Sequence, residues 1–421
     1  MISMKAREIA LNILNKYEKD KNYINLELKV ALNGIESVEK ALATELIYGV
    51  IRYKANLDYV RNLFSKLKEN KLSDSVKNII RIGIYQILYL DKIPDSAACN
   101  ESVKLAYKYA NKGAAGFVNA MLRKVAREKD SISYPEDKKE LLMVKHSFPK
   151  EIIDVFVRDF GIEKAEEVIV ASNINKGITL RPNLLKITKS DFREMLASAN
   201  ADYVEDENVF IVKNYSHINL NGFDNGLYTI QDKASVDAVV LLNPQPGETV
   251  LDICAAPGGK SCCLAQLMGN SGKVVACDLY EHRTKLIANT ADRLGVTIID
   301  TLVNDGQVLR KDFIEKFDRI LVDAPCSGLG VISKKPDIKW SEHDFDSLSV
   351  LQYNILSNAV KYLKPGGTIV YSTCTLNSLE NSCVVNKILD NFSNLKKDNE
   401  VLLLPGALND GFYMCRILKE K

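Results

Sequence analysis

The chain has 421 residues, of which 46% are hydrophobic and 26% are charged, and its formal net charge is +2. This composition is typical of globular domains and excludes a disordered, collagen-like or low-complexity chain. No apolar run approaches the roughly 18 residues that a membrane span needs, and the apolar pattern of residues 1–21 is interrupted by charges, so we expect neither a membrane segment nor a signal peptide. The length predicts two or three domains.

Cysteine usage indicates a reducing compartment. The nine cysteines include no C-x-x-C pair, and only four histidines are present, so we expect no metal site and free thiols in the cytoplasm. A buried cysteine usually acts as a small hydrophobic residue. We interpret six of the nine in this way: Cys99, Cys262, Cys263, Cys277, Cys383 and Cys415.

The first part of the chain predicts an all-α domain over residues 1–138. Apolar residues recur at helical spacing in 6–17 and 80–88, and the same period runs through 38–67, 95–109 and 114–127. Residues 1–138 carry 24 Lys and Arg against 17 Asp and Glu. This excess favours an RNA-facing surface, although an ordinary solvated helical surface would look the same.

A small mixed module is predicted over residues 139–220. It follows a polar stretch at 129–139 that contains Pro135 and reads as a linker. Helical patterns at 150–172 and 190–199 are interleaved with short strand patterns at 178–181 and 209–212. We therefore expect an α+β module that connects its two neighbours.

Residues 221–421 predict an α/β domain. Strand patterns at 249–253, 273–277, 298–303, 319–322 and 368–372 alternate with helical patterns at 260–268, 283–294 and 347–363. Such alternation indicates βαβ units and a parallel sheet. Ligands bind such sheets outside the carboxyl ends of the strands, so the residues after each strand are the candidate site.

A ligand loop follows the first of these strands as Cys254-Ala255-Ala256-Pro257-Gly258-Gly259-Lys260. Small residues let the backbone approach a ligand, and the helix that follows presents free N–H groups to it. Pro257 lacks an N–H donor, which suits a pyrophosphate poorly and favours a compact zwitterion such as S-adenosylmethionine. Asp278, after the second strand, can accept from ribose hydroxyls, and Asp305, after the third, from an adenine amino group. A tight turn with surface carboxylates is the structural alternative.

Two thiols follow neighbouring strands, Cys326 behind Asp323-Ala324-Pro325 and Cys374 behind Ser372-Thr373. Carbon 5 of cytosine accepts a methyl group only after a thiolate has added to carbon 6, and that addition requires an acid near N3. Asp323 and either thiol would meet these needs. The spacing does not decide which thiol is the nucleophile.

The motifs DICAAPGGK, DAPCSGLG, PDIKW, KPGG, YSTCT and DGFYMCRILK resemble the NOL1/NOP2/Sun family of RNA cytosine-5 methyltransferases. The segments YQILYLDKIPDSAACNESVKLA and GFVNAMLRKV are similar to the antitermination protein NusB. Together the resemblances span nearly the whole chain. They imply a multidomain protein with an all-α NusB-like domain (1–138), an α+β module (139–220) and a Rossmann-like class I methyltransferase domain (221–421).

The resemblance also implies roles for residues. Cys374 would be the nucleophile, and Cys326 would help to release the product. S-adenosylmethionine would be bound by Cys254–Lys260, Asp278, Asp305 and Asp323, and Asp323 would also face the target base. The implied substrate is one cytosine in a hairpin loop of naked 16S rRNA, with RNA affinity from the NusB-like domain and placement of the loop by the middle module. We expect a monomer, because no heptad pattern is present.

One departure from the family and two other functions remain open. Most members carry two arginines where this chain has Ser333-Lys334; a lysine lacks the bidentate fork of arginine, and a serine cannot neutralise phosphate. A non-catalytic RNA-binding or antitermination factor is one alternative function. The other is a cytosine methyltransferase that acts on tRNA.

Overall fold

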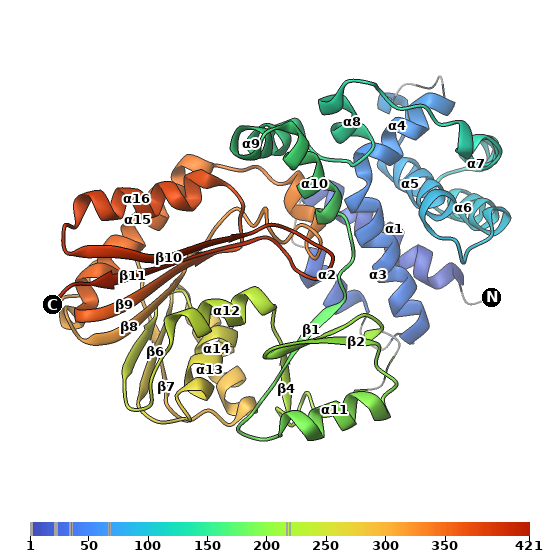
Figure 1. The fold of residues 1–421 in the computed structure, drawn as a ribbon. Coiled ribbons are helices and arrows are strands. Elements are labelled where there is room, and N and C mark those ends of the chain that lie inside the picture. The colour runs from blue at the N-terminus through green and yellow to red at the C-terminus, as the bar shows by residue number, and fades with distance from the viewer. Residues whose placement is uncertain are drawn as a thin grey trace. The chain divides into compact units, whose positions relative to one another are not determined.

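The computed structural model describes residues 3–20, 24–32, 35, 37–65, 67, 69–215, 218 and 220–421. The chain divides into two compact units (Figure 1): Met1–Asn173 with Lys334–Ser341, and Ile174–Ser333 with Glu342–Lys421. The domain boundaries expected after residues 138 and 220 do not coincide with this division, and they stay a prediction. Among the described residues, no helix combines the length and the apolar character of a membrane span.

The first unit is helical. The region predicted as one helical pattern at 38–67 forms two helices with a break at Tyr53, and residue 66 lies outside the described part. The pattern at 150–172 also forms two helices, because Gly161 interrupts it with a φ of +76°. The α-helices are α1 (Ser3–Asp20), α2 (Ile24–Ala31), α3 (Ser37–Arg52), α4 (Lys54–Phe64), α5 (Asp74–Tyr89), α6 (Asp95–Tyr109), α7 (Lys112–Glu128), α8 (Lys138–Val144), α9 (Lys150–Phe160) and α10 (Ile162–Ser172).

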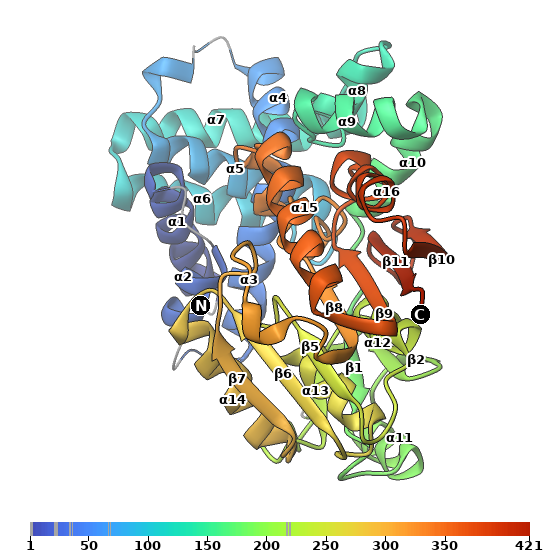
Figure 2. The same cartoon turned by 90° about the vertical axis from the view of Figure 1, so that its left-hand side faces the viewer.

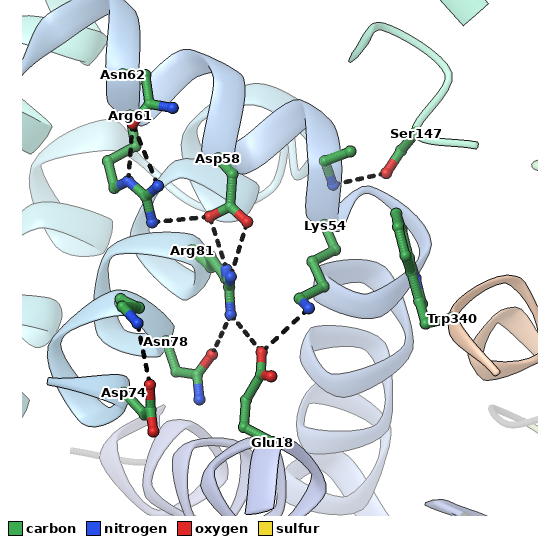
Figure 3. A network of polar contacts seen from close by, with 12 residues as sticks. Glu18, Lys54, Asp58, Arg61, Asn62, Asp74, Asn78, Arg81, Ser147 and Trp340 are labelled. Atoms are coloured by element: carbon green, nitrogen blue, oxygen red, sulfur yellow. Dashed lines mark hydrogen bonds and ion pairs between the residues drawn. The ribbon is translucent and has the colours of Figure 1, made fainter. Parts of the chain in front are cut away.

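A buried ionic network joins three helices of this unit (Figure 3). Arg81 in α5 donates to both carboxylate oxygens of Asp58 in α4, at 2.9 and 2.7 Å, and to Glu18 in α1 at 2.7 Å. Lys54 lies 3.4 Å from Glu18, and Arg61 pairs with Asp58 at 3.0 Å. The side chain of Arg81 is 5% exposed, so its charge is compensated by these two carboxylates rather than by water.

A segment far along the chain caps α3. The short helix η5 (Pro336–Trp340) belongs to the first unit. Lys339 donates to the carbonyl of Arg52 at 2.6 Å, and the indole of Trp340 donates to the carbonyl of Ile51 at 2.8 Å. The last carbonyls of a helix lack partners within it, so these donors satisfy the end of α3. Burial, followed by the nearby charge of Arg52, holds the pKa of Lys339 well below its usual value.

The second unit begins with a four-stranded antiparallel sheet in the order β2-β3-β1-β4. Its core contains Phe192 and Leu196 from the adjacent helix, packed against Leu180, Phe210 and Tyr228 of the sheet. Two of its strands, β2 and β4, lack a counterpart in the sequence prediction. The elements are β1 (Ile178–Pro182), α11 (Lys189–Ser198), β2 (Tyr203–Asp206), β3 (Val209–Val212) and β4 (Tyr228–Ile230).

The larger sheet has the strand order β10-β11-β9-β8-β5-β6-β7. Five strands run parallel, side by side in Figure 2, and β11 and β10 complete the sheet in antiparallel pairing. The parallel part confirms the predicted α/β class; the two antiparallel strands were not predicted. The strands are β5 (Thr249–Asp252), β6 (Lys273–Asp278), β7 (Ile299–Val303), β8 (Phe317–Asp323), β9 (Leu363–Thr373), β10 (Leu395–Leu403) and β11 (Phe412–Lys419).

Helices cover both faces of this sheet (Figure 1). One core includes Val239, Leu264 and Leu294 from α12 (Lys233–Leu242), α13 (Gly259–Leu267) and α14 (Glu281–Leu294). The other includes Leu356 and Val385 from α15 (Phe345–Tyr362) and α16 (Ser382–Asn391). With both faces buried, the carboxyl edge of the parallel strands is the part of the sheet that loops can shape into a site.

We expect Arg81→Met to lower the free energy of unfolding of the helical unit by about 2–3 kcal/mol, because it leaves Asp58 and Glu18 without their shared cation. Urea unfolding followed by tryptophan fluorescence measures this, since Trp340 is the only tryptophan in the sequence and packs on the core of that unit. Lys104→Met is the matched control: its pair with Glu101 is exposed, and the expected change is below about 0.5 kcal/mol. Equal effects of the two substitutions would contradict the role of the network.

Candidate active site

The predicted ligand loop connects β5 to α13 at the carboxyl edge of the sheet. Gly258 caps α13 with a φ of +102°, and a Cβ there would lie 3.0 Å from the Cα of Ile287, so glycine suits this position on two counts. The peptide between Ala256 and Pro257 is cis. The N–H of Ala256 donates to Asp278 Oδ2 at 3.2 Å, which joins the loop to the end of β6. The structure therefore brings Asp278 to the predicted loop.

Buried polar atoms without a hydrogen bond mark the same edge. Among the described residues, Asp252 Oδ1 at the end of β5 and Asn304 Nδ2 just after β7 are buried and have no hydrogen-bond partner in the protein. Buried polar groups are nearly always bonded, so an acceptor and a donor left open here indicate a place for a polar ligand. Asp305 is half-buried beside Asn304, and its Oδ1 accepts from the N–H of Gln307 at 2.9 Å.

This arrangement fits S-adenosylmethionine as a ligand class. The molecule offers an ammonium and ribose hydroxyls as donors for the carboxylates, and adenine ring nitrogens as acceptors for an amide. Asn304 was not among the predicted ligand residues. Its adjacency to Asp305 was the only signal in the sequence, and a single asparagine after a strand resembles an ordinary turn.

Asp323 ends β8 and is bound from two sides. Lys260 Nζ donates to its Oδ2 at 2.7 Å, and Ser372 Oγ at the end of β9 donates to its Oδ1 at 2.9 Å. Burial lowers the pKa of Lys260, but the negative charge of Asp323 and its hydrogen bond with Lys260 outweigh this, so the net pKa of Lys260 is raised. Lys260 therefore keeps its positive charge inside the site. Sequence reasoning placed it in the ligand loop but did not pair it with Asp323.

The two candidate thiols lie together. The sulfur atoms of Cys326 and Cys374 are 3.3 Å apart, and both side chains are partly buried. The hydrogen bond with Cys374, then burial, then the negative charges of Cys374 and Glu380 hold the pKa of Cys326 well above its usual value. The predicted meeting of two thiols at neighbouring strand ends is thus observed, whereas their separate roles remain predictions.

The thiol loops interlock with the segment before β11. The N–H of Gly330 donates to the carbonyl of Cys374 at 2.9 Å, and the N–H of Gly411 donates to the carbonyl of Gly330 at 2.8 Å. A Cβ at Gly330 would lie 2.1 Å from the carbonyl oxygen of Gly411. A side chain at position 330 would therefore separate the segments that hold Cys374.

One expectation for the cysteines is contradicted by the structure. Cys383 is exposed, so its interpretation as a buried hydrophobic residue was wrong: it faces outward from α16, where the other face packs on the sheet.

Ser333 is buried and donates to Asp410, which also accepts from Lys176 at 2.8 Å. The serine at this departure from the family therefore forms a hydrogen bond inside the protein. Among the described residues, no cluster of three or more His, Cys, Asp or Glu side chains is arranged to hold a metal ion.

Comparison with known proteins agrees with this description. Residues 239–416 match the family described as 16S rRNA methyltransferase RsmB/F, and residues 4–127 match the NusB family. The chain is 37% identical to the probable ribosomal RNA small subunit methyltransferase B of Bacillus subtilis, over 98% of each protein.

Solved structures show the same architecture. The crystal structure of PH0851 has a TM-score of 0.81 at 24% identity and covers 100% of this chain and 99% of that one. A methyltransferase homologue from Pyrococcus horikoshii has a TM-score of 0.60 at 29% identity, over 68% of this chain and 99% of that one. The first of these likenesses supports the fold alone.

A NusB-type helical part joined to a Rossmann-like sheet defines a methyltransferase of the RsmB/F type. The resemblances to NusB and to the Sun-type methyltransferases are confirmed, and so is the predicted fold class. The chain belongs to the ribosomal RNA small subunit methyltransferase B family.

The electrostatics of Asp252 predict an unusual pH dependence. Burial raises its pKa to about 7, against 3.8 for the ordinary group, so the folded protein binds more protons than the unfolded chain between these values. The contribution of Asp252 to the free energy of unfolding should therefore fall as the pH rises from about 4 to 7. We expect Asp252→Asn to stabilise the ligand-free second unit at pH 8, measured by hydrogen exchange of its peptides.

The control is Asp318→Asn. Burial raises the pKa of Asp318, but hydrogen bonds from Lys364 and from the N–H of Thr249 outweigh it, and the net pKa is lowered. That carboxylate contributes stability above its unfolded pKa, so its removal should destabilise the unit at pH 8. Destabilisation by both substitutions would contradict the raised pKa of Asp252.

Proposed function

We propose that this protein methylates carbon 5 of a cytosine in 16S rRNA with S-adenosylmethionine, through a covalent bond between Cys374 and carbon 6. The observation that carries the proposal is the pair of thiols 3.3 Å apart, beside a carboxylate that is bound to a partly buried lysine. The rRNA substrate follows from the names of the relatives, which are small subunit rRNA methyltransferases.

The charges around the thiols favour Cys374 as the nucleophile. The cation of Lys260 interacts with Cys374, and a nearby cation favours the thiolate form. The carboxylate of Glu380 instead acts on Cys326 and disfavours its thiolate. The spacing of the two cysteines does not decide which one is the nucleophile, and these charges favour Cys374.

The residues would act in sequence on the base. The Cys374 thiolate would add to carbon 6 while the Lys260 ammonium, held by Asp323, stabilises the negative charge at N3, so that carbon 5 would become enamine-like. Cys254–Lys260, Asp278 and Asp305 would hold S-adenosylmethionine, whose sulfonium would supply the methyl group and leave as the neutral thioether. After the proton on carbon 5 is lost to a base, Cys374 leaves carbon 6, and Cys326 assists this release from 3.3 Å away.

The other parts of the chain would serve RNA recognition. The NusB-like domain, proposed as residues 1–138, carries the basic excess and would supply affinity for the phosphate backbone. The module at 139–220 would help to place the target loop, and residues 221–421 would carry the reaction.

A methylation assay tests the function directly. The purified full chain is incubated separately with protein-free 16S rRNA, bulk tRNA and assembled small subunits, each with methyl-labelled S-adenosylmethionine, and the modified nucleosides are identified by mass spectrometry. We expect 5-methylcytosine at one site in free 16S rRNA and none with Cys374→Ala, which should still bind the cofactor. Cys383→Ala, at an exposed cysteine outside the site, is the matched control and should retain activity.

The other outcomes separate the alternatives. Label in tRNA alone would keep the chemistry and overturn the substrate. Tight RNA binding with no label in any RNA would support the non-catalytic factor. Robust turnover by Cys374→Ala would refute its role as the nucleophile.

Cys326→Ala should accumulate a covalent protein–RNA adduct, because carbon 6 is attacked normally but the product is released slowly. A denaturing gel with labelled 16S rRNA detects this as a slowly migrating band. The band should be absent in Cys326→Ala/Cys374→Ala. Free RNA alone in the Cys326→Ala lane, with the protein folded and able to bind RNA, would count against this role.

A further inference from the structure

A carboxylate is fully buried behind the thiols. Glu380, the last residue of η6 (Ser378–Glu380), has an exposed fraction of 0%. Its Oε1 accepts from Ser327 Oγ at 2.6 Å and from Asn377 Nδ2 at 3.1 Å; its Oε2 accepts from the N–H of Ser327 at 2.8 Å and from Gln352 Nε2 at 3.0 Å. Burial of a carboxylate is costly unless it is well bonded, and these four donors are all neutral.

Three of the four bonds go to the loops that carry the thiols. Ser327 directly follows Cys326, and both its N–H and its hydroxyl bind the carboxylate. Asn377 lies three residues after Cys374. The hydroxyl of Ser327 also lies 2.7 Å from Thr375 Oγ1, so the two loops meet at the same carboxylate.

The fourth bond joins this arrangement to a rigid helix. Gln352 in α15 donates to Glu380 and also to the carbonyl of Pro325 at 2.8 Å, directly before Cys326. Tyr371 in β9 donates to the backbone carbonyl of Glu380 at 2.6 Å. The carboxylate is therefore fixed by a helix and a strand, and the loops are fixed by the carboxylate.

We propose that Glu380 is a positioning residue of this site, whose carboxylate sets the relative placement of Cys326 and Cys374 by binding both of their loops. The proposal rests on the proposed function for its catalytic consequence, but the placement of the thiols is a separate property. A well-packed apolar residue would serve overall stability as well as a buried charge does, so stability alone does not account for a carboxylate here.

Thiol crosslinking measures the placement without any reaction on RNA. Dibromobimane bridges two nearby thiols: each sulfur displaces one bromide ion and loses one proton. Peptide mapping of the treated full chain then gives the ratio of bridged Cys326–Cys374 to singly alkylated product. The ratio reports the distance between the thiols, and Ser327→Ala, which keeps the charge of Glu380, separates a change of distance from a change in the reactivity of Cys326.

Two substitutions test the carboxylate, with one matched control. Glu380→Gln keeps the size of the side chain but presents N–H donors where two other donors point. Ser327→Ala removes the hydroxyl that binds both Glu380 and Thr375. Glu400→Gln is the control, because Glu400 also accepts two side-chain hydrogen bonds in this unit but lies in β10, and its partners are Lys397 and Tyr413.

We expect the bridged ratio to fall in Glu380→Gln and in Ser327→Ala and to stay at the wild-type level in Glu400→Gln. In the methylation assay, kcat should fall by about 10²-fold in Glu380→Gln with KM for RNA unchanged, because binding is intact but the reacting groups are misplaced. If Glu380→Gln does not fold, Ser327→Ala decides the question.

An unchanged bridged ratio in folded Glu380→Gln and Ser327→Ala would overturn the proposal. A fall in the ratio in a protein whose wild type forms no 5-methylcytosine would support the placement by Glu380 and refute the proposed reaction. Failure of the Glu380 proposal and failure of the proposed methylation reaction therefore give different results.

Discussion

The candidate site depends on one partly buried ion pair, Lys260 with Asp323. Lys260 lies in the first turn of α13, and its ammonium is 2.7 Å from Asp323 at the end of β8 and 5.5 Å from the ring centre of Phe412 at the start of β11. Burial disfavours the ammonium, and only the adjacent negative charges retain it. Three segments distant in sequence must therefore remain together, or a partly buried charge is left without its partner.

Much of the site was predictable because parallel strands impose their own geometry. Asp323 and Ser372 are direct partners in the pairing of β8 with β9. Cys326 and Cys374 follow them by three and two residues, so the strand register alone brings the thiols to one edge. The strand–helix alternation was sufficient to infer this, and the ligand loop before α13 was found for the same reason.

The missed features depend on contacts that local patterns do not contain. Charged residues are expected at the surface, yet Glu380 and Lys339 are among the most buried residues of the protein. Lys339 caps α3 through the carbonyl of Arg52, 287 positions away in the sequence. Strands β10 and β11 and helix α16 were not predicted; they follow the fifth parallel strand, and the two strands extend the sheet by antiparallel pairing rather than as βαβ units. Only long-range pairing reveals these features.

Two thiols at 3.3 Å are best treated as one titrating system. Removal of a proton from either sulfur leaves an anion bonded to the thiol that keeps its proton, and removal of both protons would place two anions in contact. The pair therefore carries at most a single negative charge, and the surroundings decide which sulfur bears it. Lys260 acts on Cys374 and Glu380 acts on Cys326, so both groups move the charge in the same direction. A site that needs one thiolate and one thiol would gain this asymmetry from two side chains of opposite charge, Lys260 and Glu380.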